Sequence, residues 1–66
     1  MKAPEIKPEV QLVGEDGNAF SIMARVGMAL RKAGADKEYI DQYQQEAMSG
    51  DYDNLLAVTM QYVDAL

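Results

Sequence analysis

The fold of this chain is decided by the stretch from Asn18 to Gly34, which reads N-A-F-S-I-M-A-R-V-G-M-A-L-R-K-A-G. Asn18 is a favourable helix N-cap, because its side chain can accept a hydrogen bond from a free backbone N–H of the first turn. Gly34 suits the other end, because glycine readily adopts the left-handed conformation that ends a helix. The stretch therefore predicts a helix of about four turns. Its apolar residues recur at three- and four-residue spacing and form one stripe that must be buried: Ala19, Ile22, Met23, Val26, Ala29, Leu30 and Ala33.

Two further helices are predicted after this one, and both have clear start signals. Asp36 is the N-cap candidate of a second helix that runs to about Met48, where Ser49-Gly50 stops it. Asp51 is the N-cap candidate of a third helix that continues to Leu66. The apolar stripe of the second comprises Ile40, Tyr43, Ala47 and Met48, and that of the third Tyr52, Leu55, Leu56, Thr59, Met60, Tyr62, Val63 and Leu66.

The short links between these helices predict a compact arrangement. Gly34-Ala35 and Ser49-Gly50 leave so little chain that each helix must fold back on its predecessor. We therefore expect a mainly α protein, a compact three-helix bundle over residues 18–66, within one small domain of residues 1–66. Gly27, in the middle of the first helix, costs stability relative to alanine, and close approach of another segment explains it best.

The N-terminal part of the chain is predicted to be extended. Residues 1–9 contain two prolines and read as an arm, and residues 10–17 as a short strand and turn. The strand signal covers Glu9 to Val13, and Gly14 to Gly17 read as the turn. A lone strand lacks a partner, so three arrangements stay open: it lies across the helices, pairs with its copy in a homodimer, or adds to the sheet edge of a binding partner.

The composition excludes several kinds of active site. The chain has no Cys and no His, which rules out zinc sites built from them, His-based acid–base catalysis and Cys–His or Ser–His nucleophile pairs. Residues 15–18 and 51–54 group oxygen ligands without the spacing of a twelve-residue calcium loop. We expect no catalytic, cofactor or metal residues and hence no enzyme; a small carboxylate enzyme or calcium-binding domain is the alternative of another class.

The chain also lacks the signals of membrane insertion and of direct nucleic-acid binding. No apolar run approaches the roughly 20 residues that span a bilayer, and the N-terminus has no signal-peptide apolar region, so we expect a cytoplasmic protein. The net charge of −5 argues against direct binding to nucleic acid, whose affinity comes mostly from Lys and Arg.

The negative charge is concentrated in the second half of the chain. Residues 33–66 carry one base, Lys37, against seven acids, and they hold all four tyrosines. Acids at helix starts have a structural role, because the helix dipole favours negative charge there. The second helix nevertheless presents a mainly acidic face, with Glu38, Asp41 and Glu46 off its apolar stripe. This acidic surface is either only a solvated face, or it resembles a nucleic-acid backbone and meets Lys and Arg of a partner. Under the second interpretation the partner-binding residues are Glu38, Tyr39, Asp41, Glu46, Asp51 and Asp53.

Tyrosines and methionines divide between core and surface in this interpretation. Tyr39 lies at the edge of its stripe and is the candidate for an exposed contact anchor. Tyr43, Tyr52 and Tyr62 follow the predicted core stripes. The five methionines, three of which fall inside helical patterns, are expected to fill the core rather than to form a binding groove.

Three segments carry a resemblance to known sequences: V-x-L-V-G-x-D-G-N-A-F-x-I at Val10–Ile22, A-L-R-K-A-G at Ala29–Gly34 and S-G-D-Y-D-N-L-L at Ser49–Leu56. Together they resemble a group of small uncharacterised proteins from bacteriophages and prophages. The group carries no established activity, so the resemblance implies an origin and no mechanism. By analogy of size, origin and charge, it suggests an inhibitor of the anti-CRISPR class.

These observations predict a non-enzymatic protein-binding inhibitor in the host cytoplasm. Its acidic surface would occupy the nucleic-acid site of a host protein or nucleoprotein complex that presents a basic surface. The alternative is a small interaction or dimerisation module of a phage or bacterial assembly, which uses Val10 to Val13 or an exposed apolar surface without mimicry.

Overall fold

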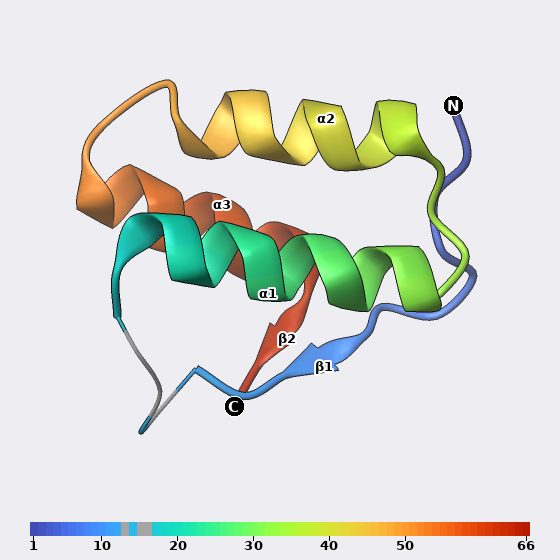
Figure 1. Cartoon of the computed structure of the whole chain (residues 1–66), viewed down its shortest axis with the longest axis horizontal. Helices are drawn as coiled ribbons and strands as arrows, with labels where there is room; N and C mark the ends of the chain where they lie inside the picture. The colour runs from blue at the N-terminus through green and yellow to red at the C-terminus, as the bar shows by residue number, and fades with distance from the viewer. Residues whose placement is uncertain (13, 15–16) are drawn as a thin grey trace.

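The computed structural model describes residues 1–12, 14 and 17–66, and it contains three helices and a pair of short strands (Figure 1). In chain order these are β1 (Glu9–Val10), α1 (Ala19–Lys32), α2 (Lys37–Ala47), α3 (Tyr52–Tyr62) and β2 (Asp64–Ala65). The molecule is therefore mainly α, as the sequence predicts. Val13, Glu15 and Asp16, which belong to the predicted strand and turn, lie outside the described residues.

The helix boundaries follow the cap residues expected from the sequence. Asn18 accepts hydrogen bonds from the N–H groups of Phe20 and Ser21, Asp36 from that of Tyr39, and Asp51 from that of Asn54. At the end of α1, Gly34 has a positive φ of 103°. Its N–H donates to the carbonyl of Arg31 and that of Ala35 to the carbonyl of Leu30, which is the Schellman arrangement.

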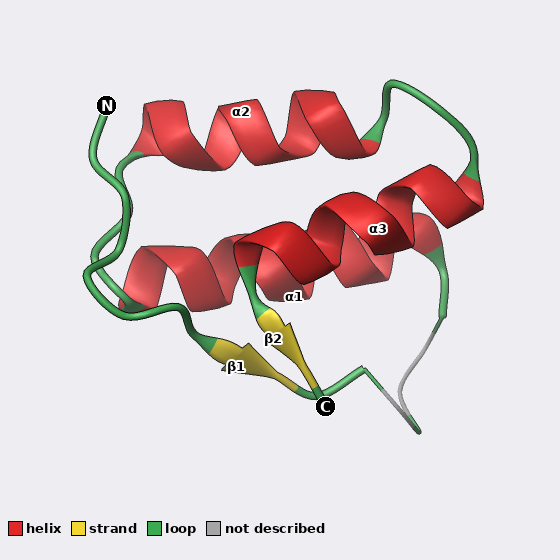
Figure 2. Cartoon of the chain, turned by 180° about the vertical axis from the view of Figure 1, so that it is seen from behind, coloured by secondary structure: helices red, strands yellow, loops and turns green. Residues whose placement is uncertain are grey.

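The helices pack around one core, with α2 against both α1 and α3 and the strand pair on the side of α1 and α3 away from α2 (Figures 1 and 2). The stripe of α1 faces inward as predicted, and the side chains of Val26 and Leu30 are fully buried. The core consists of Val10, Ile22, Met23, Val26, Leu30, Ala35, Tyr43, Ala47, Leu55, Val58, Tyr62 and Val63.

The third helix is shorter than predicted, because the chain leaves the helical conformation at Val63. Val63 is extended, with φ −140° and ψ 162°, and it is almost fully buried. The following residues form β2, which pairs in parallel with β1: Glu9 lies opposite Asp64, and Val10 opposite Ala65. The predicted continuation of the helix to Leu66 is therefore wrong, because the ends of the chain satisfy each other's backbone groups.

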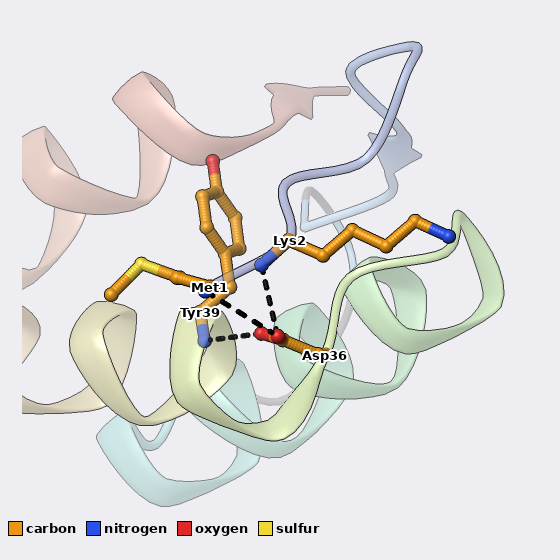
Figure 3. Close-up of polar contacts among 4 residues, drawn as sticks. All are labelled: Met1, Lys2, Asp36 and Tyr39. Carbon is orange, nitrogen blue, oxygen red and sulfur yellow. Dashed lines mark hydrogen bonds and ion pairs between the residues drawn. The ribbon is translucent and has the colours of Figure 1, made fainter.

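The pairing of β1 with β2 also determines the position of the N-terminal strand. The strand lies beneath the helices and pairs with the C-terminal segment of its own chain. The N-terminal arm is tied down as well: the backbone N–H of Lys2 donates to the carboxylate of Asp36, and the N–H of Asp36 donates to the carbonyl of Lys2 (Figure 3). The arm therefore runs from the start of α2, past the end of α1, into β1.

Candidate functional site

The first two acids of the predicted site, Glu38 and Asp41, both lie on α2 but have different surroundings. Glu38 lies in the first turn of α2 and is exposed. Asp41 is half-buried and accepts a hydrogen bond from the Nζ of Lys37 at 2.8 Å. This bond raises the pKa of Lys37 above its ordinary value, because the nearby carboxylate favours the ammonium form. Asp41 thus has an ion-pair partner within the chain, although both side chains remain in contact with solvent.

Glu46, near the end of α2, is also engaged by a neighbour. It accepts a hydrogen bond from the hydroxyl of Tyr62 at 2.9 Å, and the same hydroxyl accepts one from the Nε2 of Gln42 at 2.9 Å. The pKa of Tyr62 is raised, first by burial and then by the bond to Glu46 and its negative charge. Glu46 therefore holds α2 against α3.

Tyr39 is not the exposed anchor that the sequence predicts. Its side chain is half-buried, and its ring packs edge-on against Tyr62 with the ring centroids 5.3 Å apart. Tyr43 also packs edge-on against Tyr62, with the ring centroids 5.1 Å apart. Tyr39 thus belongs to an aromatic cluster at the α2–α3 contact, because the edge of the stripe faces the neighbouring helix and not the solvent.

Asp51 and Asp53 lie at the opposite end of α2 from Glu38, at the start of α3. Asp51 caps α3, since its Oδ1 accepts from the N–H of Asn54 at 2.9 Å, and it remains exposed. Asp53 is exposed and has no hydrogen bond or ion pair within the described part of the chain. Glu38 and Glu46 are eight residues apart on α2, which corresponds to roughly 12 Å along the axis. The structure therefore brings Glu46, Asp51 and Asp53 to one end of the bundle and leaves Glu38 and Asp41 nearer the other.

A group of exposed apolar side chains lies at this same end, and the sequence patterns did not single it out. Phe20 of α1 is 75% exposed, Met48 after α2 is 58% exposed, and Tyr52 of α3 is 47% exposed. We call these three residues, together with the buried Met23 of the core beneath them, the apolar corner. The sequence predicts Met48 and Tyr52 in the core, and both predictions are wrong. The same holds for Met28 and Met60, which are also exposed.

The apolar corner is hollowed and borders on a carboxylate. Two shallow hollows of about 260 and 270 Å³ share Phe20, Met23 and Met48, and the first also reaches Asp51 and Tyr52. Tyr52 is fixed there, because its hydroxyl donates to the carbonyl of Gly17 at 2.7 Å. The apolar residues of the corner are therefore contiguous and lie beside the acidic start of α3.

The sequence contains a signal for one residue of the apolar corner, Phe20. Phe20 is the only phenylalanine and lies off the stripe of α1, so a helix that buries this stripe must expose it. Met48 and Tyr52 carried no such signal, because both fit the helical spacing. Their exposure follows from their places at the end of α2 and the start of α3, where no neighbouring helix covers them.

Within residues 1–12, 14 and 17–66, no group of three or more acidic, His or Cys residues could hold a metal ion. In the same ranges, no helix is long and apolar enough to cross a membrane. Comparisons with models of protein families, with curated proteins and with solved structures found no match for this chain.

Proposed function

We propose that this protein is a small non-catalytic interaction domain that binds another protein through the apolar corner and the carboxylates beside it. The observation that carries the proposal is the exposure of Phe20, Met48 and Tyr52 side by side at one end of the bundle. A contiguous apolar surface with a polar rim is typical of a protein-binding site. Methionine adapts its shape to a partner, and aromatic rings supply contact area at little entropic cost.

The charges next to the corner define the partner more closely. Asp51 and Asp53 are exposed, and each directly flanks Tyr52 in the sequence. The complementary surface is therefore a protein segment that combines apolar side chains with Lys or Arg. Burial of the apolar residues supplies the affinity, and the two carboxylates orient the partner.

A matched pair of methionine substitutions tests this proposal. Met48 and Met60 have nearly the same exposure, 58% and 57%, but Met60 lies on α3 outside the apolar corner. Immobilised wild-type, Met48→Gln and Met60→Gln proteins are used to capture proteins from a bacterial lysate, with quantitative mass spectrometry. We expect a protein that wild type and Met60→Gln retain equally and that Met48→Gln loses by about tenfold. Equal loss, or equal retention, in the two variants would contradict the assignment of the corner.

A second candidate function rests on the acidic surface alone. Glu38 and Asp53 are exposed, with no ion pair among the described residues, and residues 33–66 carry a net charge of −6. In this form the chain is an anti-CRISPR-like inhibitor of phage origin, which occupies the nucleic-acid site of a host complex in the cytoplasm.

Salt and nucleic acid distinguish the two candidates. A mimicked phosphate surface loses its partner as salt rises and releases it to competing DNA or RNA, and the double variant Glu38→Lys with Asp53→Lys no longer binds. Binding through the apolar corner withstands salt and competitor and is lost in Met48→Gln. These two carboxylates are better test positions than Asp41 and Glu46, whose bonds to Lys37 and Tyr62 also support the fold.

A further inference from the structure

A third hollow of the surface lies between β1 and α1, and it borders on a hollow of the apolar corner, because Ala24 lines both. It is a groove of about 600 Å³, lined by Glu9, Val10 and Gln11 from the β1 side and by one face of α1 that includes Ala24, Met28 and Lys32. None of the apolar corner residues lines it. The groove therefore constitutes a separate candidate site, and the inference from it does not rest on the proposed function.

The backbone of β1 presents an edge to this groove. On the side of β2, the ladder uses the carbonyls of Pro8 and Val10 and the N–H of Leu12. Successive residues of an extended strand direct their backbone groups to opposite sides, so the N–H and C=O of Glu9 point away from β2. Glu9 also lines the groove. An extended chain laid in the groove thus meets a hydrogen-bonding edge.

The helix layer continues beneath this edge. β2 packs on α3, and β1 packs on α1, so a strand added beyond β1 would lie over the outer face of α1 (Figure 2). That face offers an apolar floor, since Met28 is 64% exposed and lines the groove together with Ala24. Every second side chain of the added strand would contact this floor.

Lys32 favours an acidic occupant of the groove. Of the charged residues that line the groove, Glu9 lies on the β1 side, and Arg25 and Lys32 lie seven residues apart on one face of α1. Arg25 is already engaged within the chain, so the choice of occupant depends on Lys32. Lys32 is exposed and has no ion pair within the described part of the chain. We propose that this groove binds an extended, acidic segment of another protein, which adds a third strand to the sheet at the edge of β1 and places carboxylates at Lys32.

The test uses short peptides as the probe. A set of eight-residue peptides that alternate Val or Ile with Asp or Glu is titrated into ¹⁵N-labelled full-length protein, next to a set with Lys at the acidic positions. We expect acidic peptides to shift the amide signals of Glu9 and of the α1 face at Met28 and Lys32, which line the groove and not the apolar corner. Lysine peptides should leave these signals unchanged.

Three variants make the result specific. Glu9→Pro removes an N–H that the ladder does not use and blocks the edge, so it should abolish binding while thermal unfolding stays close to wild type. Lys32→Glu should weaken binding about fivefold. Arg31→Glu is the control, because Arg31 is the adjacent exposed cation of the same helix turn and does not line the groove. It should bind as wild type does.

Several outcomes would overturn the inference. These are equal binding of acidic and lysine peptides, binding that survives Glu9→Pro, equal loss in Lys32→Glu and Arg31→Glu, or no binding by any peptide of the set. Signal shifts confined to Phe20, Met48 and Tyr52 would also refute the groove and support the apolar corner instead. A dimer that Glu9→Pro dissociates would show that a second copy occupies the edge, and this too would overturn the proposal.

Discussion

At the scale of single residues, the core contains a buried pair of hydroxyl groups, those of Tyr43 and Thr59. Both side chains are fully buried, and their hydroxyl oxygens are 2.8 Å apart. Burial raises the pKa of Tyr43, because the interior disfavours the phenolate. Without this hydrogen bond, each hydroxyl would be a buried polar group that lacks a partner.

We expect Thr59→Val to lower the free energy of unfolding by about 1–3 kcal/mol, because it leaves the Tyr43 hydroxyl without its partner. The double variant Tyr43→Phe with Thr59→Val should lose less than the sum of the two single variants, since it removes both polar groups together. Urea unfolding of all four proteins measures this coupling. Additive losses would show that the contact contributes nothing of its own.

At the scale of elements, two glycines affect the stability of α1 in opposite ways, one inside the helix and one just after its end. Gly34 ends the helix with φ 103°, a conformation that side chains disfavour. Gly27 has an ordinary helical backbone, and a Cβ built there would lie 3.6 Å from Cγ2 of Ile40, which is a normal van der Waals contact. α2 therefore approaches α1 closely at Gly27, as the sequence predicts, but the space between them still accommodates a methyl group.

Alanine substitutions should consequently shift stability in opposite directions. Gly34→Ala is expected to lower the free energy of unfolding by about 1–2 kcal/mol, because it strains the Schellman turn. Gly27→Ala is expected to raise it by up to about 1 kcal/mol through the better helix propensity of alanine. Chemical denaturation decides the signs. A stabilised Gly34→Ala or a clearly destabilised Gly27→Ala would contradict this account.

At the scale of the whole molecule, Asp36 joins the N-terminal arm to the helices. Its carboxylate accepts from the N–H groups of Tyr39 and Lys2, each at 2.9 Å, and lies 4.0 Å from the terminal amine of Met1 (Figure 3). These contacts, first the bond from Tyr39 and then that from Lys2, lower the pKa of Asp36 below its ordinary value of 3.8. The charged form is thus favoured in the folded state.

The lowered pKa sets the sign of an acid dependence. The contribution of Asp36 to stability is complete above its unfolded pKa and is lost as the pH falls through the folded value, because the unfolded chain binds the proton more readily. Asp36→Asn keeps an N-cap and removes the titration. Between about pH 5 and pH 2, wild type should therefore lose more stability than Asp36→Asn. Parallel thermal-unfolding curves over this range would refute the prediction.

The helix caps of this molecule follow directly from its sequence. Asn18, Asp36 and Asp51 act as N-caps, and Gly34 ends α1, because each signal depends only on the chemistry of a few adjacent residues. The end of α3 could not be predicted in this way. Val63 fits the helical spacing, and it leaves the helix only because the distant N-terminal segment offers a strand partner.

The candidate site likewise combines local features, which the sequence predicts, with contacts between helices, which it does not predict. The positions of the acids were evident, and the i,i+4 bond between Lys37 and Asp41 follows from spacing alone. The bond between Glu46 and Tyr62 joins two helices and has no local signal. Likewise, exposure of Met48 depends on where the helices end relative to one another, so the apolar corner appears only in the folded structure.

The parallel pairing of Glu9 with Asp64 has a consequence for the order of folding. Nearly the whole chain lies between the two strands, and closing such a long loop has a large entropic cost until the helices have brought its ends together. We therefore expect the strand pair to form late in folding and to open early in unfolding. Because the groove is formed by β1 and α1 together, a ligand that fills it would favour the docked position of the N-terminal segment and so oppose the opening of the strand pair.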